Sequence, residues 1–176
     1  ILLTDKIDIE YHCNRYEEIA SKLEGYTDRC VISFVDLYKK TERNMRNLRI
    51  KNFDSITMLK IGRRLSEIAR RHGFIIETCS EKIDLLSVGI EHGKCIDDKL
   101  ISKIVGNKIK VNKDKNQRDV CGCVESIDIG AYNTCKHSCL YCYANYSEMA
   151  VKNNIFKERH AFSAANSPKG LVDYTD

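Results

Sequence analysis

The chain has 176 residues, of which 43% are hydrophobic and 31% charged, and it carries a formal net charge of +4. This length is enough for one sizeable core, and the composition is that of an ordinary soluble globular protein, with a charge that favours an anionic partner only slightly. No apolar run approaches the ~20 residues that cross a bilayer, which excludes a membrane-spanning protein and predicts a cytoplasmic one with reduced thiols.

The first half of the chain predicts helices and strands in alternation. Residues 8–23 place apolar side chains on one helical face, which indicates an amphipathic helix. Residues 30–37 are a β-branched and apolar run, typical of a buried strand. A second amphipathic helix is expected over 55–72 with Ser55 as its N-cap, and a second strand over 74–79.

Residues 39–51, between the first strand and the second helix, hold six basic side chains and the single acid Glu42. A solvated loop or helix surface is favoured over a phosphate-binding patch, because no aromatic platform is interleaved.

The second half predicts a third helix over 97–105 and then a polar, basic connector over 107–118. A short strand is expected at 109–111 within the connector. Residues 124–129 alternate imperfectly between apolar and polar, which favours a further strand in the same sheet.

Strands that alternate with helices predict βα units around a parallel sheet. We therefore expect an α/β fold: a partial (β/α) barrel-like parallel sheet over residues 1–118, with a cysteine-rich, cluster-binding segment over 119–176 packed on the same domain. Because residue 1 is Ile rather than Met, we expect the barrel to lack an N-terminal part.

Two carboxylates follow from this architecture, since reactive groups of parallel α/β folds gather at the carboxyl ends of strands. Asp36 and Glu77 lie near those ends and are the candidates for binding or orienting a substrate. Capping of the following turn is an equally weighted alternative.

The densest chemical signal is the loop Cys135-Lys-His-Ser-Cys139-Leu-Tyr-Cys142. Three thiols in one short loop can surround one metal centre without a large closure cost, and three ligands without a fourth suit a cubane with one open iron. Zinc held by these thiols with His137 or an upstream cysteine is the main alternative. Disulfides are disfavoured, because nine cysteines is an odd number and no signal peptide is visible.

This loop resembles the radical S-adenosylmethionine motif, Cys-x3-Cys-x2-Cys with an aromatic residue before the last cysteine. The run from Cys121 to Asn145 is similar to the end of the bacterial domain-of-unknown-function family 1848, and the resemblance spans residues 1–168. It implies a [4Fe-4S] cluster on Cys135, Cys139 and Cys142, with Tyr141 bordering bound S-adenosylmethionine. Such enzymes commonly bind this cofactor with a Gly-Gly-Glu-like segment as well, and no Gly-Gly occurs in this chain.

Two function classes stay open. The resemblance implies a radical-type enzyme of unknown substrate that needs an electron donor. The alternative is a non-catalytic zinc or iron-sulfur protein whose basic stretches dock a partner such as nucleic acid.

A second metal site is the last expectation. If the strands and helices form βα units, four further thiols lie in loops or at strand ends on the same edge of the sheet. Four thiols are enough for a second, fully ligated metal centre. They are Cys79, Cys95, Cys121 and Cys123. The alternative is that they pack as plain apolar residues, as expected for Cys13 and Cys30.

Overall fold

The computed structural model of the chain describes residues 1–165, apart from the side chains of Lys40 and of residues 158–165. Unit 1 comprises Ile1–Asp36 and Asn47–Ile127, and unit 2 comprises Leu37–Arg46 and the chain from Asp128 onward. The domain boundary expected between residues 118 and 119 stays a prediction, and its C-terminal segment beyond residue 165 lies outside the described residues. Within the described part, no helix is long and apolar enough to cross a membrane.

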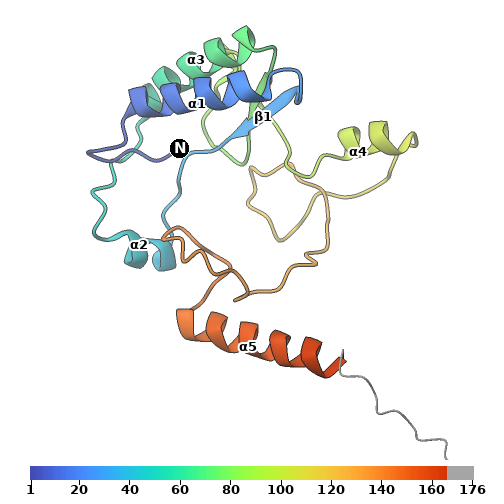
Figure 1. The fold of residues 1–176 in the computed structure, drawn as a ribbon. Helices are drawn as coiled ribbons and strands as arrows, with labels where there is room; N and C mark the ends of the chain where they lie inside the picture. Colours follow the sequence, from blue (N-terminus) through green and yellow to red (C-terminus); the bar gives the residue numbers. More distant parts are fainter. Residues whose placement is uncertain (166–176) are drawn as a thin grey trace, which may run out of the picture. The chain divides into compact units, whose positions relative to one another are not determined.

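Two long helices form one layer of unit 1. α1 spans Ile9–Leu23 and begins after Asp8, whose carboxylate accepts a hydrogen bond from a first-turn N–H at 2.8 Å. α3 spans Ser55–Arg71, and its N-cap is Asp54 instead of the expected Ser55, because the Asp54 carboxylate accepts the first-turn N–H at 2.7 Å. An aspartate at this position satisfies the amide that a serine cap would have taken. Figure 1 shows α1 and α3 side by side.

The sheet has three parallel strands in the order β1, β2, β3, which span Arg29–Ile32, Ile75–Thr78 and Glu91–His92. The first two are shorter than the expected strands over 30–37 and 74–79. Neighbouring strands are consecutive in the chain, as in successive βα units. The fold is therefore a small α/β arrangement around a parallel sheet.

The strands expected at 109–111 and 124–129 are wrong. The described residues of this region contain one isolated antiparallel bridge, between Lys113 and Val124. Ile127 and Ile129 are 89% and 97% exposed, so no surface covers the side chains that suggested a strand. The third strand is instead β3, two residues that carry no recognisable strand pattern.

The two faces of the sheet differ. On one face Ile32 and Ile76 are buried in a core cluster with Ile61 and Leu65 of α3 and Ala20 of α1. Each fully buried aliphatic side chain of this kind contributes roughly 1.5–3 kcal/mol.

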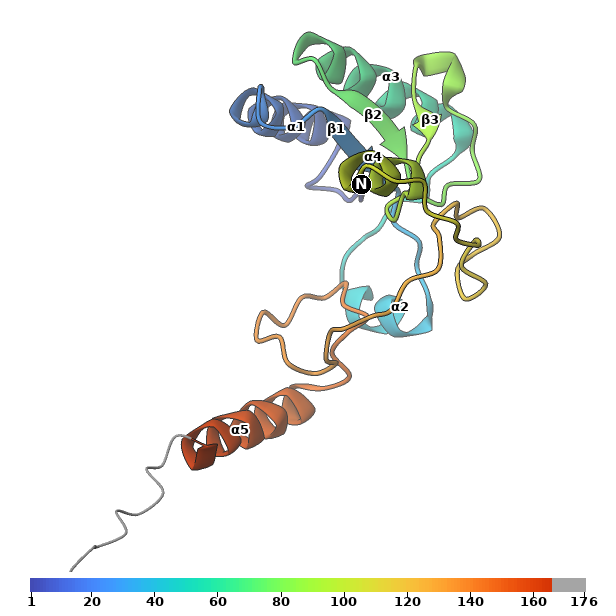
Figure 2. The same cartoon turned by 90° about the vertical axis from the view of Figure 1, so that its right-hand side faces the viewer.

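The other face carries Val31 and Glu77, which are paired in the register of β1 and β2. These helices do not cover it. α4, Asp98–Val105, lies on this side of the sheet (Figure 2) and is capped by Asp97.

A close approach of backbone to side chain fixes the connection between β2 and β3. This connection contains the 3-10 helix η1, Leu86–Val88, which packs against α3. A Cβ at Gly62 would lie 3.3 Å from Val88 Cγ2 and 3.4 Å from Ile90 Cδ1. Glycine at this point of α3 therefore lets the connection pack closely and start β3 beside β2.

The described residues of unit 2 form two helices. α2 spans Lys39–Met45, so the first half of the basic segment 39–51 is helical, with Thr41 and Met45 buried. α5 spans Glu148–Ala165 and was not expected from the sequence, because its apolar residues do not gather on one face. Val151 is the one buried side chain among those described for α5.

Candidate metal centre

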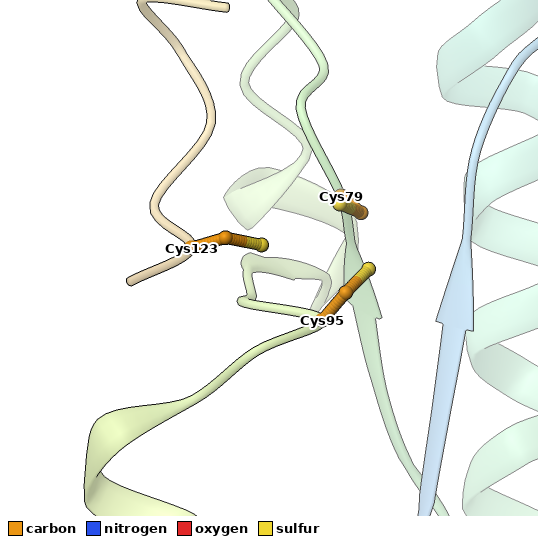
Figure 3. Close-up of side chains that lie close together, drawn as sticks. All are labelled: Cys79, Cys95 and Cys123. Atoms are coloured by element: carbon orange, nitrogen blue, oxygen red, sulfur yellow. The ribbon is translucent and has the colours of Figure 1, made fainter. Parts of the chain in front are cut away.

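Three cysteines from separate segments of unit 1 converge at the carboxyl end of β2. Cys79 directly follows β2, Cys95 lies between β3 and α4, and Cys123 lies in the segment after α4. Their Sγ atoms all lie within 4.8 Å of one another, and Figure 3 shows the three side chains close together. Among the residues that the structure describes, this is the one group of three or more metal-ligating side chains at that spacing. It is a cysteine group that can bind a metal.

Backbone hydrogen bonds bring the three segments together. Cys79 N donates to Ile32 O at 3.1 Å, which continues the pairing of β2 with β1 beyond the strand end. Gly93 N donates to Thr78 O at 2.7 Å and places the loop after β3 beside β2. Val124 N donates to Ile96 O at 3.2 Å and ties the Cys123 segment to that loop.

Gly93 is required by this arrangement. A Cβ at this position would lie 2.5 Å from Glu77 Oε2 and 2.8 Å from Glu77 Cβ, a separation that Cβ atoms in proteins essentially never show. Glycine therefore allows the loop that carries Cys95 to lie directly against β2.

Cys121 is the fourth thiol at this place. Its side chain is 4% exposed, and its thiol interacts with that of Cys123 and, over a longer range, with that of Cys79. Burial raises the pKa of Cys121 above its ordinary value. Three of the four expected thiols thus belong to the close group, Cys121 lies beside Cys123, and their role as a metal site stays a prediction.

The surroundings bias which thiol ionises first. Burial and the nearby Cys95 thiol raise the pKa of Cys79 to about 12. Burial opposes ionisation of Cys123 as well, yet its pKa is lowered, because Ile96 N–H donates to its Sγ at 3.4 Å and the neighbouring thiols also donate to it. These hydrogen bonds favour the thiolate form of Cys123, and binding a metal would release thiol protons from the group.

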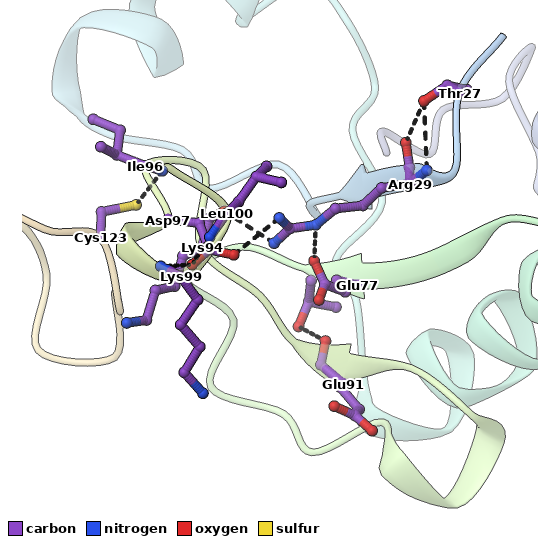
Figure 4. Close-up of polar contacts among 11 residues, drawn as sticks. Thr27, Arg29, Glu77, Glu91, Lys94, Ile96, Asp97, Lys99, Leu100 and Cys123 are labelled. Carbon is purple, nitrogen blue, oxygen red and sulfur yellow. Dashed lines mark hydrogen bonds and ion pairs between the residues drawn. The ribbon is translucent and has the colours of Figure 1, made fainter. Parts of the chain in front are cut away.

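A polar network on the open face of the sheet fixes the Cys95 loop. Arg29 pairs with Glu77 and reaches Asp97 Oδ2 and Lys94 O, each at 3.1 Å (Figure 4). Its planar group thus joins β1, β2 and the loop that precedes α4. Glu77 lies on the face that α1 and α3 leave uncovered, and its role toward a substrate stays a prediction.

Asp36, the other expected carboxylate, lies four residues beyond the end of β1. It forms an ion pair with Arg118, and both residues line a cavity of about 770 Å³ in unit 1. Its role toward a substrate likewise stays a prediction.

The loop 135–142 belongs to unit 2. Cys135 and Cys139 are exposed and Cys142 is partly buried. Asn145 Nδ2 donates to Cys135 O at 2.7 Å and Asn133 N donates to Ala144 O at 3.0 Å, so the loop is closed at its base. The loop cysteines do not belong to the close sulfur group found among the described residues, and their cluster stays a prediction.

One tyrosine of this loop packs against a tyrosine at the start of α2. Tyr141 makes an edge-to-face contact with Tyr38, with ring centroids 6.0 Å apart. His137 is exposed. The expected role of Tyr141 beside a cofactor and the alternative of His137 as a zinc ligand stay predictions.

Sequence reasoning missed Ser80, a buried serine that follows Cys79 and lines the same cavity as Asp36. A single serine after a strand is typical of an ordinary turn, whereas Ser80 has a backbone φ of 58° in the structure. No sequence signal predicts that value.

The comparisons with known proteins give one match. A family model described as Domain of unknown function (DUF1848) matches residues 1–144, a range that includes all nine cysteines. Neither the curated proteins nor the solved structures contain a match to the chain. Since the matched range is well over half of the sequence, the chain belongs to the DUF1848 family.

Proposed function

We propose that the chain is a thiolate metal protein in which Cys79, Cys95 and Cys123 hold one metal ion in unit 1, with Cys121 as the fourth ligand. The observation that carries this proposal is the convergence of three sulfurs within 4.8 Å, from segments far apart in the sequence. Plain apolar packing requires no such convergence of thiols. Converging cysteine thiolates are the donor set of a structural site that binds a soft or borderline cation.

The spacing favours a single ion over an iron-sulfur cubane. Zinc–sulfur bonds of ~2.3 Å in a tetrahedron place the ligand sulfurs ~3.8 Å apart. A cubane binds each cysteine to a different iron and so needs its sulfurs further apart. Sulfurs that already lie within 4.8 Å need only a small contraction to bind zinc.

The groups around the sulfurs also suit a four-thiolate zinc site, which carries two negative charges. The Ile96 N–H that donates to Cys123 Sγ supplies a hydrogen bond to sulfur. The Lys94 ammonium pairs with Asp98 Oδ1 at 2.6 Å and also interacts favourably with Cys123. The Lys94 side chain crosses Gly122, where an added Cβ would lie 3.2 Å from Lys94 Cγ. Glycine between the two cysteines thus lets the Lys94 side chain lie beside them.

Metal analysis tests this proposal. Full-length protein expressed with zinc should contain ~one zinc per chain, and cobalt exchanged into the site should show thiolate-to-cobalt charge-transfer absorption. Replacing Cys79, Cys95 or Cys123 by Ala should remove the zinc, whereas the matched control Cys30→Ala should retain it. Unchanged zinc in all three variants would contradict the proposal.

The second candidate function is a radical S-adenosylmethionine-type enzyme with its [4Fe-4S] cluster on the loop 135–142. The spacing of Cys135, Cys139 and Cys142 supports it, as do the exposure of the first two and the closed base of the loop. A cluster with one open iron would supply the electron that cleaves S-adenosylmethionine, and Tyr141 would border that cofactor. An electron donor and a substrate would complete the reaction.

A partial (β/α) barrel would accommodate this candidate. Supporting it are the consecutive order of three parallel strands and the restriction of α1 and α3 to one face of the sheet. In a barrel the opposite face, which carries Glu77, would point inward.

Anaerobic reconstitution with iron and sulfide tests the second candidate. The expected product is brown, and its broad absorption should change when S-adenosylmethionine is added. Protein that stays colourless while it retains zinc would eliminate this candidate and leave the first unaffected.

A further inference from the structure

Unit 1 contains a cavity of about 770 Å³ at the carboxyl edge of its parallel sheet. The edge of a sheet where strands deliver their C-terminal residues is where ligands bind in open α/β folds. The walls come from the residues after β1 and β2, from the N-terminus of α3 and from residues 118–120. Two of these walls adjoin the cysteine group, because Ser80 follows Cys79 and Val120 precedes Cys121.

Ser80 is the least explained polar group of the cavity wall. Its side chain is 8% exposed, and its Oγ forms no hydrogen bond with any described residue. Its φ of 58° lies in the left-handed region, which an L-residue with a Cβ rarely adopts. A buried hydroxyl left without a partner is costly, and so is the conformation that holds it there. A ligand that hydrogen-bonds to the Ser80 hydroxyl would offset both of these costs.

The charges on the rim are of both signs. Asp36 and Arg118 form an ion pair in the cavity wall, and Lys82, Asp119 and Glu81 also line the cavity. The Glu81 carboxylate already accepts hydrogen bonds from Phe34 N–H and Ser33 Oγ. A simple anion attracted by Arg118 would be repelled by Asp36. A simple cation attracted by Asp36 would be repelled by Arg118. A ligand with one positive and one negative group can lie antiparallel to the pair and satisfy both.

Part of the remaining wall is apolar and is formed by Phe53, Met58, Ile83 and Val120. A ligand that bears two opposite charges close together and an apolar arm matches both parts of the wall.

We propose that this cavity binds a free α-amino acid with an apolar side chain, whose ammonium and carboxylate groups meet the Asp36–Arg118 pair and whose backbone end reaches Ser80 Oγ. This site goes beyond the metal centre: the proposal concerns binding alone, and it holds whichever metal the cysteine group carries.

Isothermal titration of the full-length, metal-loaded protein tests the proposal with L-leucine and L-phenylalanine as probes. Each is compared with two analogues that lack either the ammonium group or the carboxylate. These are 4-methylpentanoate and 3-methylbutylamine for leucine, and 3-phenylpropanoate and phenethylamine for phenylalanine. Losing either charged group should weaken binding about tenfold or more. The proposal is overturned if neither amino acid binds at millimolar concentration, or if one analogue binds as tightly as its parent amino acid.

Ser80→Gly sharpens the test. Glycine accepts a positive φ, so the variant should fold and melt no lower than the parent protein while it binds the amino acid about tenfold more weakly. The matched control is Ser138→Gly, since Ser138 has a φ of 51° but lies in unit 2. Unchanged affinity in Ser80→Gly would contradict the role of this hydroxyl.

Two rim variants complete the test. Asp36→Asn and Arg118→Gln each remove the charge and leave a polar side chain, and each should weaken binding about tenfold. If both variants bind the amino acid as tightly as the parent protein does, the charge-pair assignment is overturned. Zinc is measured on every sample, so a protein that binds no metal but still binds leucine refutes the proposed metal function alone.

Discussion

Replacing Gly93 by Ala is the sharpest perturbation of the cysteine group that leaves every sulfur in the chain. The new Cβ would lie 2.8 Å from Glu77 Cβ, where ordinary contact requires 3.4 Å or more, so the loop must move away by roughly 0.6 Å. Glu77 Cβ belongs to β2 and cannot rotate aside, so the loop that carries Cys95 must retreat. Overpacking of this kind costs about 1–3 kcal/mol of unfolding free energy.

The same displacement should weaken zinc binding by about 10–100-fold, because the metal needs all its sulfurs at fixed distances. The assay is competition with a chromophoric chelator, together with urea unfolding of the metal-free protein. Gly106→Ala is the matched control: its φ of 74° makes alanine costly by about 1 kcal/mol, but its Cβ would touch nothing within 4 Å. Equal zinc affinity in Gly93→Ala and Gly106→Ala would refute the reasoning.

Three further expectations follow from particular contacts. Changing each cysteine of the loop 135–142 to Ala should abolish cluster iron in reconstituted protein while circular dichroism stays unchanged, and iron retained in all three variants would exclude the loop as ligand. Glu17 and Glu24, which contact His72, raise the pKa of His72 above 6.5. The protonated imidazole therefore stabilises the fold fully below pH 6.5, and this stabilisation is lost as pH rises through the raised pKa. His72→Gln should remove this pH dependence from urea unfolding curves. Arg29→Met should cost about 1–3 kcal/mol of unfolding free energy, because it leaves two partly buried carboxylates without their cation, whereas Lys22→Met in an exposed pair should change it by less than about 0.5 kcal/mol.

Helices with one strong apolar face were predictable from the sequence. α1, α3 and α4 begin and end within a residue or two of the expected positions, since each has a clear periodicity and a glycine or cap at its end. α5 was missed because its apolar residues are spread around the helix. The strand expected at 124–129 was wrong because alternation without a covering surface does not make a strand.

The candidate metal centre was partly predictable. Cysteines that follow strands or lie in strand-linking loops were expected to share one edge of a parallel sheet, and Cys79, Cys95 and Cys123 do so. The sequence carried no sign that Gly93 must be a glycine, because the contact that excludes a side chain comes from Glu77 on another strand. The position of Ser80 was equally hidden, since burial depends on segments far away in the chain.

The two sets of cysteines place different demands on the fold, and this difference suggests different roles. A metal between Cys79 and Cys123 closes a loop of 44 residues, and a cross-link of that length removes about 4 kcal/mol of unfolded-state entropy. One between Cys135 and Cys142 closes 7 residues and is worth only about 2.4 kcal/mol by the same relation. A metal at the sheet edge would therefore contribute more to holding unit 1 together. A metal on the loop 135–142 would contribute less, and the exposure of Cys135 and Cys139 would leave it open to molecules from solution.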